Sequence, residues 1–381
     1  MARLAVIGST GSIGRQTLEV VRALPNRLQV VALAAGNNIE LLQEQALEFR
    51  PLYLYAERGE KELYHALGEA GLSCNWARPE EMATAPEVDL VMVATAGGAG
   101  LLPTMAALKA RKVVALANKE VLVMAGHLVN AALSHGGEVR PVDSEHSAIW
   151  QCLWGEAPDK ISRLILTASG GPFRDRPLHE LAKVTPQEAL AHPTWQMGPK
   201  VTVDSATLIN KGFECLEARW LFQVPLERIH VVMHKESIVH SLVEFCDGSV
   251  KAQLSMPDMR LPIQLALTYP ERLTGVSLPP LDLAQVGCLH FGPVDWERYP
   301  CLALALEAGK KGGTYPAVLA AADEVAVQMF LEGHIGFTDI RYILEEVLEA
   351  HEGVPEPDLG QVLEAEAWAK AWAMAWVRSK G

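Results

Sequence analysis

The chain has 381 residues, of which 49% are apolar, and its formal net charge is −13. This length exceeds what a single hydrophobic core usually serves, so two or three domains are expected. The acidic balance argues against a general binder of nucleic acids or of anionic membranes. Any anionic ligand must therefore be bound by a few local cations.

The six cysteines are scattered, with no C-x-x-C pair and no histidine at ligand spacing. This pattern predicts buried thiols in a reducing compartment and not a disulfide framework or a zinc site. A strand predicted at residues 4–7 leaves no room for a signal peptide. The most apolar region, residues 88–110, is interrupted by three glycines and a proline, which argues against a membrane span. A soluble cytoplasmic protein is expected.

The first motif follows the strand at 4–7. It is GSTGSIG at residues 8–14, and a helix is predicted after it at 15–24, stopped by Pro25. Strand, glycine turn and helix form the context of a dinucleotide-binding fingerprint, in which backbone amides approach a pyrophosphate at a helix N-terminus. The spacing is G-x-x-G-x-x-G and not G-x-G-x-x-G, so a glycine-rich turn without a ligand stays an alternative.

A second strand is predicted at 28–35. NAD-binding folds place an acidic residue at the end of this strand, on the ribose 2′-hydroxyl. This chain has Gly36, Asn37 and Asn38 there instead. The missing acid favours NADP over NAD, although no Arg or Lys stands in this segment to bind the 2′-phosphate.

Strands and helices then alternate. Strands are predicted at 88–93, 112–117 and 138–142, and helices at 101–110, at 120–133 and from residue 147. This alternation predicts a doubly wound (Rossmann-like) parallel sheet, whose ligands gather at the carboxyl ends of the strands. Two polar clusters, residues 118–120 and 143–147, follow such ends.

The pattern changes after residue 150. Strands are predicted at 161–166, 229–233, 241–246 and 250–254, the last two joined by an Asp247-Gly248 turn, so this region is expected to be α+β and largely antiparallel. Residues 174–199 lack a sustained period. This long segment, which carries Trp195 and Met197, is expected to be either a lid over a site or a surface loop.

Residues 200–221 are predicted to form a short strand at 201–203 and then a helix that begins at Asp204-Ser205. One arc of this helix is apolar (Ile209, Phe213, Leu216 and Trp220), and the opposite arc is polar (Thr207, Asn210, Lys211 and Glu214). A solvated helix face and an anion site both fit the polar arc. Gly212 inside the helix suggests that another group approaches closely there.

Four helices are predicted near the C-terminus, at 302–307, 316–330, 338–350 and 359–377. The expected organisation is an NADPH-binding Rossmann-like domain at 1–150, an α+β catalytic domain at 151–285 with a lid at about 186–199, a connector at 286–310 and a small helical domain at 311–381.

Three carboxylates are candidates for a metal site. Asp143 and Glu145 share a face if the chain is still extended there, and Glu214 could join them. Oxygen ligands without clustered His or Cys suit Mg²⁺ or Mn²⁺, with Co²⁺ as a further candidate. Two acids one residue apart are also common on any surface, so ordinary surface carboxylates stay an alternative.

Seven segments, in order, resemble one known family. They are GSTGSIG, LANKE (116–120), DSEHSA (143–148), SGGPF (169–173), HPTWQMG (192–198), VDSATLINKGFE (203–214) and PDMR (257–260). The resemblance is to the 1-deoxy-D-xylulose 5-phosphate reductoisomerases and covers essentially the whole chain. It implies rearrangement of this ketose phosphate, by a retro-aldol or an α-ketol path, and reduction by NADPH to 2-C-methyl-D-erythritol 4-phosphate.

The resemblance also implies residue roles. Asp143, Glu145 and Glu214 would bind the divalent cation, and Lys119, Glu145 and His192 would take part in catalysis. The substrate would be bound by Ser144, Ser169, His192, Trp195, Met197, Ser205, Asn210, Lys211 and Ser237. NADPH would be bound by Gly8, Thr10, Gly11, Ser12, Ile13, Gly14, Gly36, Asn37, Asn38, Asn118, Lys119, Glu120 and Met259. A homodimer without nucleic-acid or membrane partners is expected.

Two positions depart from the family pattern. Asn37 and Asn38 stand where relatives often carry a basic residue beside the 2′-phosphate, and Thr194 stands at a lid position that is often Asn. Two other functions stay open: a dehydrogenase that needs no metal, and a regulatory protein that senses NADP without chemistry. Loss of turnover on chelation would exclude the first, and NADPH consumption with the ketose phosphate would exclude the second.

Overall fold

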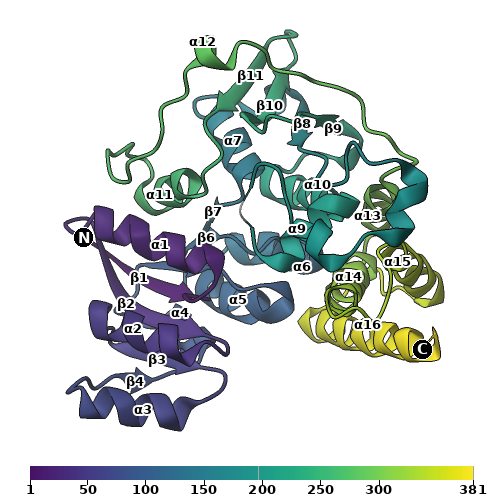
Figure 1. The fold of residues 1–381 in the computed structure, drawn as a ribbon. Helices are drawn as coiled ribbons and strands as arrows, with labels where there is room; N and C mark the ends of the chain where they lie inside the picture. The colour runs from purple at the N-terminus through teal and green to yellow at the C-terminus, as the bar shows by residue number, and fades with distance from the viewer. Residues whose placement is uncertain (196, 381) are drawn as a thin grey trace. The chain divides into compact units, whose positions relative to one another are not determined.

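The computed structural model describes residues 1–195 and 197–380 (Figure 1). Gln196, in the predicted lid, and Gly381, in the predicted helical domain, lie outside the described residues. The chain divides into two compact units. Unit 1 comprises residues 1–121, 129–147 and 258–279, and unit 2 comprises residues 122–128, 148–257 and 280–381.

Unit 1 contains a seven-stranded parallel sheet, as predicted. Its strands are β1 (Ala2–Ile7), β2 (Leu28–Ala35), β3 (Tyr53–Ala56), β4 (Asn75–Trp76), β5 (Leu90–Val93), β6 (Val113–Leu116) and β7 (Glu138–Pro141). The order is β4-β3-β2-β1-β5-β6-β7. The chain therefore reverses direction across the sheet between β1 and β5, which is where doubly wound sheets open a ligand crevice.

Helices connect these strands. They are α1 (Ser12–Ala23), α2 (Ile39–Phe49), α3 (Glu60–Glu69), α4 (Pro79–Thr84), α5 (Leu101–Lys109) and α6 (Lys119–Leu133), with a 3₁₀ turn at Gly97–Gly100. Right-handed crossovers on both sides of β1 place helices on both faces of such a sheet. The elements between residues 39 and 84 have no counterpart in the sequence-based predictions.

A later segment of the chain returns to unit 1. Helix α11 (Arg260–Thr268) packs beside α1, and its residues Ile263 and Ala266 are fully buried in the same core as Leu4 and Val6 (Figure 1). Burial of this apolar face removes aliphatic surface from water, which stabilises the packing of α11 in unit 1. Residues 258–279 therefore belong with the parallel sheet.

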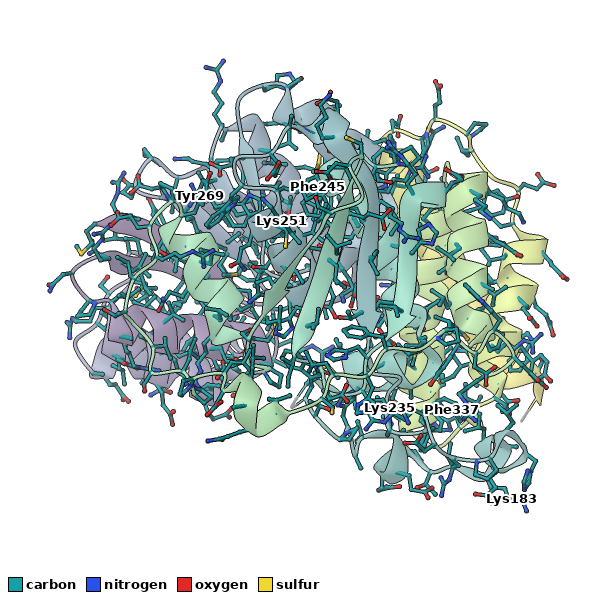
Figure 2. All side chains as sticks on the ribbon, turned by 90° about the horizontal axis from the view of Figure 1, so that it is seen from above. Lys183, Lys235, Phe245, Lys251, Tyr269 and Phe337 are labelled. Carbon is teal, nitrogen blue, oxygen red and sulfur yellow. The ribbon has the colours of Figure 1, made fainter. Side chains whose placement is uncertain are left out.

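Unit 2 contains a four-stranded mixed sheet of order β11-β10-β8-β9. Its strands are β8 (Ile161–Ala168), β9 (Ile229–Met233), β10 (Val239–Phe245) and β11 (Val250–Leu254). Two of its three pairings are antiparallel, which confirms the predicted character of the region. On the β10–β11 hairpin the Lys251 ammonium lies over the Phe245 ring, 5.6 Å from its centre (Figure 2).

The other helices follow in chain order. They are α7 (Ser144–Cys152), α8 (Pro186–Ala189), α9 (Pro199–Thr207), α10 (Ile209–Phe222), α12 (Leu283–Val286), α13 (Pro300–Lys311), α14 (Tyr315–Leu331), α15 (Asp339–Ala350) and α16 (Leu359–Lys380), with 3₁₀ turns at Pro158–Lys160, Leu178–Lys183 and Leu226–Arg228. The four predicted C-terminal helices correspond to α13–α16. Across residues 1–195 and 197–380, no helix is both long and apolar enough to cross a membrane.

The predicted strand at 201–203 is wrong. These residues belong to helix α9, whose first position is Pro199. Proline is favoured at that position because its missing N–H would have no partner there in any case. Leu208 then adopts a left-handed conformation, with φ 56°, and separates α9 from α10. The Asp204-Ser205 pair therefore lies inside a helix and does not begin one.

The extended conformation considered for residues 143–145 is also absent. Helix α7 begins at Ser144, whose backbone N–H donates to Asp143 Oδ1 over 3.0 Å. Asp143 therefore stands just before the helix and Glu145 lies in its first turn. The two carboxylates are therefore positioned by the start of helix α7 and not by the alternation of side chains along a strand.

Candidate active site

The glycine turn lies at the switch point of the sheet in unit 1. Gly8 has φ 92°, a conformation that other residues rarely adopt, and an added Cβ would lie 2.5 Å from the Ala94 carbonyl oxygen just after β5. An added Cβ on Gly14 would lie 2.2 Å from the Gly8 carbonyl oxygen. The tight strand-to-helix turn therefore leaves no room for a side chain at Gly8 or Gly14.

The first turn of α1 follows directly. Gly11 occupies the capping position and, having no side chain, cannot cap the helix. The first N–H groups of α1, at Ser12, Ile13 and Gly14, carry the positive end of the helix dipole and suit a phosphate. These features fit the pyrophosphate of a dinucleotide.

Three further predicted cofactor residues lie in unit 1. Asn38 caps α2 by accepting from Leu41 N over 3.1 Å, and Asn37 beside it is exposed. Met259 precedes α11 and packs with Ile13 against the same apolar cluster. This places an apolar surface next to the glycine turn, suitable for an aromatic ring.

Asn118 connects the ends of β5 and β6. Its Oδ1 accepts from Val121 N, which caps α6, and its Nδ2 donates to the carbonyls of Thr95 and Gly97, each over 2.9 Å. Asn118 is 1% exposed. Its side chain therefore shapes the loop after β5, and a role in cofactor binding would be exerted through that loop.

Lys119 and Asp143 form an ion pair of 2.6 Å at the carboxyl ends of β6 and β7. Both side chains are largely buried, and the His146 ring lies near the same carboxylate, with Nδ1 4.0 Å from Asp143 Oδ2. Ser144 Oγ donates to Glu145 Oε2 over 2.6 Å. Unit 1 therefore contributes two carboxylates, a lysine and a hydroxyl from adjacent strand ends.

In unit 2, Glu214 is 1% exposed and accepts hydrogen bonds from Asn210 and Lys211 one turn earlier on α10. Lys211 is 3% exposed, so the polar arc predicted here is buried and not a solvated helix face. Burial raises the pKa of the neighbouring Cys215 thiol to about 12. At neutral pH this thiol therefore keeps its proton and cannot bind a metal as a thiolate. The metal ligand that this part of the helix offers is the Glu214 carboxylate, whose oxygens suit a hard cation.

Ser169 and His192 are joined in unit 2. His192 Nδ1 accepts from the backbone N–H groups of Thr194 (3.1 Å) and Trp195 (2.9 Å), so its proton lies on Nε2 and is donated to Ser169 Oγ over 3.1 Å. Ser169 Oγ also accepts from Gly171 N. Because this oxygen accepts twice, its own O–H remains able to donate to an anion.

The predicted lid continues from His192. The Trp195 ring lies 5.9 Å from the His240 ring, and His240 Nε2 is 2.9 Å from Ser255 Oγ. Met197 is half-buried. The Trp195 ring therefore packs against His240 on strand β10 of the mixed sheet.

Ser205 approaches the same loop from α9. An added Cβ on Gly171 would lie 2.6 Å from the Ser205 carbonyl oxygen, so the SGG turn after β8 packs directly on α9. Lys200 fixes α9 by binding the buried carboxylates of Asp204 (2.5 Å) and Asp323 (2.7 Å). Unit 2 therefore brings Ser169 and His192 together beside Ser205.

Ser237 lies in the β9–β10 loop with φ 55°, which is uncommon for a non-glycine residue. His234, fully buried, holds this loop, because its Nε2 accepts from Ile238 N (3.2 Å) and Val239 N (3.1 Å). This agrees with the structural or supporting role that the sequence predicts for His234. A histidine three residues before the predicted substrate serine was the only available signal.

Comparisons with known proteins agree over the whole chain. Three family descriptions match: 1-deoxy-D-xylulose 5-phosphate reductoisomerase at residues 4–126, its C-terminal domain at 139–222, and DXP reductoisomerase C-terminal domain at 254–372. A reductoisomerase of that name from Pelotomaculum thermopropionicum is 53% identical over 386 residues, covering 99% of each chain.

Solved structures give the same result. A crystal structure described as DOX-P reductoisomerase in complex with NADPH, fosmidomycin and magnesium is 38% identical, covers 99% of this chain and 98% of its own, and has a TM-score of 0.94. The Zymomonas mobilis enzyme in complex with NADPH is 40% identical over 99% of this chain and 98% of its own, with a TM-score of 0.90. The chain therefore belongs to the 1-deoxy-D-xylulose 5-phosphate reductoisomerase family.

Proposed function

We propose that the chain converts 1-deoxy-D-xylulose 5-phosphate to 2-C-methyl-D-erythritol 4-phosphate with NADPH and a divalent cation. The observation that carries this proposal is the 53% identity over 99% of the chain to a relative of that name. The glycine turn, the buried oxygen donors and the Ser169–His192 pair supply the chemistry that the reaction needs.

The cofactor is held by unit 1. Gly8, Thr10, Gly11, Ser12, Ile13 and Gly14 bind the pyrophosphate, while Gly36, Asn37 and Asn38 bind the adenosine ribose. Asn118, Lys119, Glu120 and Met259 line the nicotinamide end. Support comes from the steric closure at Gly8 and Gly14 and from the uncapped start of α1.

The cation is held by Asp143 and Glu145 of unit 1 and by Glu214 of unit 2. Three carboxylates match the oxygen preference of Mg²⁺ and Mn²⁺, and Co²⁺ is a further candidate. When bound, the cation supplies Lewis-acid stabilisation of negative charge on the substrate oxygens. Lys119, paired with Asp143 over 2.6 Å, orients this carboxylate.

The substrate is held mainly by unit 2. Ser169, Ser205, Asn210 and Lys211 bind its phosphate, and Ser144 and Ser237 bind its hydroxyls. Lys211 supplies the charge, since it is 3% exposed and an anion would meet it without much intervening water.

His192, Trp195 and Met197 close over the bound substrate. The neutral imidazole of His192 couples the lid backbone to Ser169, so binding at the serine also orders the lid. Exclusion of water matters here, because water would intercept the fragments or the carbonyl before reduction. Both the retro-aldol and the α-ketol path are compatible with these residues.

A cytoplasmic location, a homodimer and the absence of nucleic-acid and membrane partners complete the proposal. They rest on the scattered cysteines, the net charge of −13 and the family resemblance. Sedimentation of the purified chain tests the dimer. A monomer at micromolar concentration would contradict it.

The proposed activity is tested by incubating the purified chain with NADPH, Mn²⁺ and 1-deoxy-D-xylulose 5-phosphate. We expect the absorbance of NADPH to fall and 2-C-methyl-D-erythritol 4-phosphate to appear by mass spectrometry. Unchanged absorbance under conditions where NADPH binds would favour the nucleotide-sensing alternative. NADPH consumption that persists after chelation would favour a metal-independent dehydrogenase.

A further inference from the structure

The segment after β2 lacks the charge that the 2′-phosphate of NADPH requires. Gly36, Asn37 and Asn38 offer amide donors but no cation, and Asn38 Oδ1 is already used to cap α2. A phosphate monoester carries close to two negative charges at neutral pH, so uncharged donors alone discriminate weakly against NADH.

The neighbouring β3–α3 turn lies directly against this segment. Strands β2 and β3 pair in parallel up to Ala35 and Ala56, and Glu57 N then donates to the Ala35 carbonyl oxygen over 3.1 Å. An added Cβ on Gly36 would lie 3.7 Å from Glu57 Oε2. The ends of the two strands therefore remain side by side beyond the sheet.

A second contact closes the far end of the turn. Gly59, in a left-handed conformation with φ 73°, lies so close to Ile39 that an added Cβ would fall 1.8 Å from Ile39 Cδ1. Gly36 and Ile39 flank the two asparagines, and Glu57 and Gly59 flank Arg58. The two turns thus meet on both sides of these residues.

Arg58 is exposed and has no hydrogen bond or ion pair with any other residue in the part of the chain that the structure describes. Its guanidinium is therefore available, and it offers the planar, two-pronged geometry that phosphate oxygens prefer. Glu57 beside it would repel a phosphate, so a cation is needed in this turn for an anion to bind at all.

We infer that Arg58 selects NADPH over NADH by binding the 2′-phosphate, in place of a basic residue at the end of β2. This inference rests on the proposed use of NADPH as cofactor. It assigns a specificity role to a residue from the next strand, outside the segment in which the fold rule places the ribose contacts.

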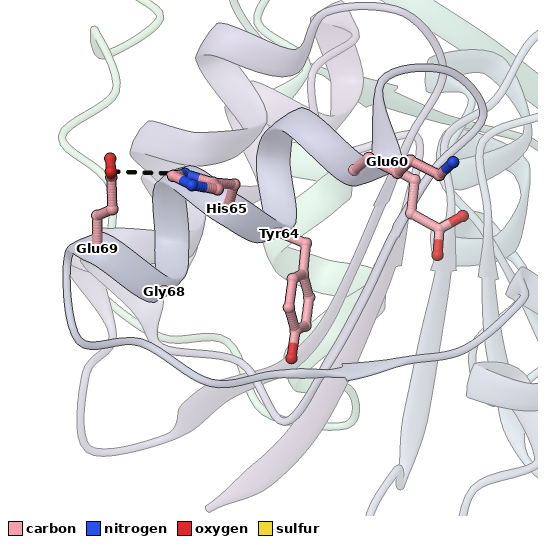
Figure 3. Close-up of a pocket in the computed structure, with 6 residues that line it drawn as sticks. Glu60, Tyr64, His65, Gly68 and Glu69 are labelled. Carbon is pink, nitrogen blue, oxygen red and sulfur yellow. Dashed lines mark ion pairs between the residues drawn. The ribbon is translucent and has the colours of Figure 1, made fainter.

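Lys61 provides a matched control. It is a cation three residues further along, on the exposed face of α3 that also carries Glu60, Tyr64 and His65 (Figure 3). On that face the only ion pair drawn in Figure 3 joins His65 to Glu69, over 3.5 Å. Replacing Lys61 removes the same charge from the neighbouring helix α3 and leaves the β3–α3 turn, which contains Arg58, unchanged.

The test is a calorimetric titration of wild type, R58A and K61A with NADPH and with NADH, without substrate. For R58A we expect the Kd for NADPH to rise about tenfold or more, while the Kd for NADH changes less than about twofold. K61A should behave as wild type with both nucleotides. Circular dichroism checks that each variant is folded.

Several results would overturn the inference. An unchanged NADPH affinity in R58A, an equal loss for NADH, or an equal loss in K61A would each show that Arg58 does not read the phosphate. If wild type itself does not bind NADPH, the proposed cofactor fails. If wild type prefers NADPH and R58A keeps that preference, only the role of Arg58 fails.

Discussion

Glu214 shows how single residues of this chain are arranged for chemistry. Its carboxylate is 1% exposed, and a buried charge is costly unless it is paired and hydrogen-bonded. Asn210 and Lys211 satisfy it from the preceding turn of the same helix. One turn of α10 therefore carries both the carboxylate that is proposed to bind the cation and the amide and ammonium that are proposed to bind the substrate phosphate.

The substitution E214Q should lower turnover more than about a hundredfold, because it removes one charged metal ligand. Binding of NADPH should change less than about twofold, since the glycine turn belongs to unit 1. Steady-state kinetics and a fluorescence titration with NADPH measure the two effects.

The control is E227Q, at an exposed position. It should change neither turnover nor the affinity for NADPH. A strong loss of NADPH affinity in E214Q would contradict the assignment of Glu214 to the metal. Thermal unfolding shows whether loss of the negative charge beside Lys211 destabilises the variant.

The substitution K211A should raise KM for the phosphorylated substrate about tenfold or more, with a smaller effect on kcat, because an interaction with a non-reacting phosphate is made in both the ground state and the transition state. The variant should show no such change with unphosphorylated 1-deoxy-D-xylulose. An unchanged KM for the phosphorylated substrate would argue that Lys211 serves only to neutralise Glu214.

At the scale of elements, Gly212 sets how closely α10 approaches α13. An added Cβ would lie 2.3 Å from Ala305 Cβ, which explains a glycine inside a buried helix. Alanine gains about 1 kcal/mol of helix propensity, but overpacking costs about 1–3 kcal/mol. We therefore expect G212A to lower the free energy of unfolding by up to about 2 kcal/mol in urea titrations.

Gly68 offers the matched control, because it also lies inside a helix and an added Cβ meets nothing within 4 Å. The variant G68A should be neutral or stabilised by up to about 1 kcal/mol. Equal effects of the two substitutions would show that contact with α13 does not limit the size of residue 212.

The lid loop depends on a neutral imidazole. Burial lowers the pKa of His192 from its ordinary value near 6.5 to about 4, with a further lowering by Arg174. In the folded protein a proton on Nδ1 would displace the N–H groups of Thr194 and Trp195. Between pH 6.5 and 4 the unfolded chain binds the extra proton and the folded one does not, so this contribution to stability is complete above pH 6.5 and is lost as the pH falls towards 4.

This pKa is measurable by NMR of the imidazole nitrogens, with the His192 signals assigned from their loss in H192Q. We expect a neutral ring with its proton on Nε2 at pH 6 and titration only near pH 4. Titration near the ordinary value would show that the loop is open to solvent and that the hydrogen bonds to Thr194 and Trp195 are not maintained.

Long apolar periods made most of the fold predictable. The strands at 4–7 and 28–35 and the C-terminal helices follow directly from them. The elements between residues 39 and 84 were not predicted: β4 is only two residues long, and α4 is only six. Residues 201–203 alternate like a strand but become helical, since Pro199 starts a helix whose buried face then packs on the core.

The candidate site was predictable where a motif fixed local geometry, as at Gly8 and Gly14. Contacts between segments that lie far apart in the sequence could not be predicted. The pairing of His192 with Ser169 joins residues 23 positions apart, and the contact of the β3–α3 turn with the segment after β2 depends on strand order. Strand order is decided by packing of the whole sheet, and no local period encodes it.

For the whole molecule, the net charge of −13 opposes its own anionic cofactor and substrate. Affinity must therefore come from short-range contacts: the start of α1, Lys211 and the proposed Arg58 and metal. Binding of this kind relies on local contacts and not on long-range attraction, and the proposed cation would offset the repulsion among the carboxylates proposed to bind it.

Removal of the cation is consequently a test of the whole arrangement. With excess EDTA we expect turnover to fall below detection while the Kd for NADPH changes less than about twofold, because the pyrophosphate contacts lie on the glycine turn and need no metal. Addition of Mg²⁺ or Mn²⁺ beyond the chelator should restore the rate. E214Q should stay inactive whichever ion is added. Full activity in EDTA would mean that Asp143, Glu145 and Glu214 do not act through a cation, and parallel loss of NADPH binding would mean that the ion supports the fold and not the chemistry.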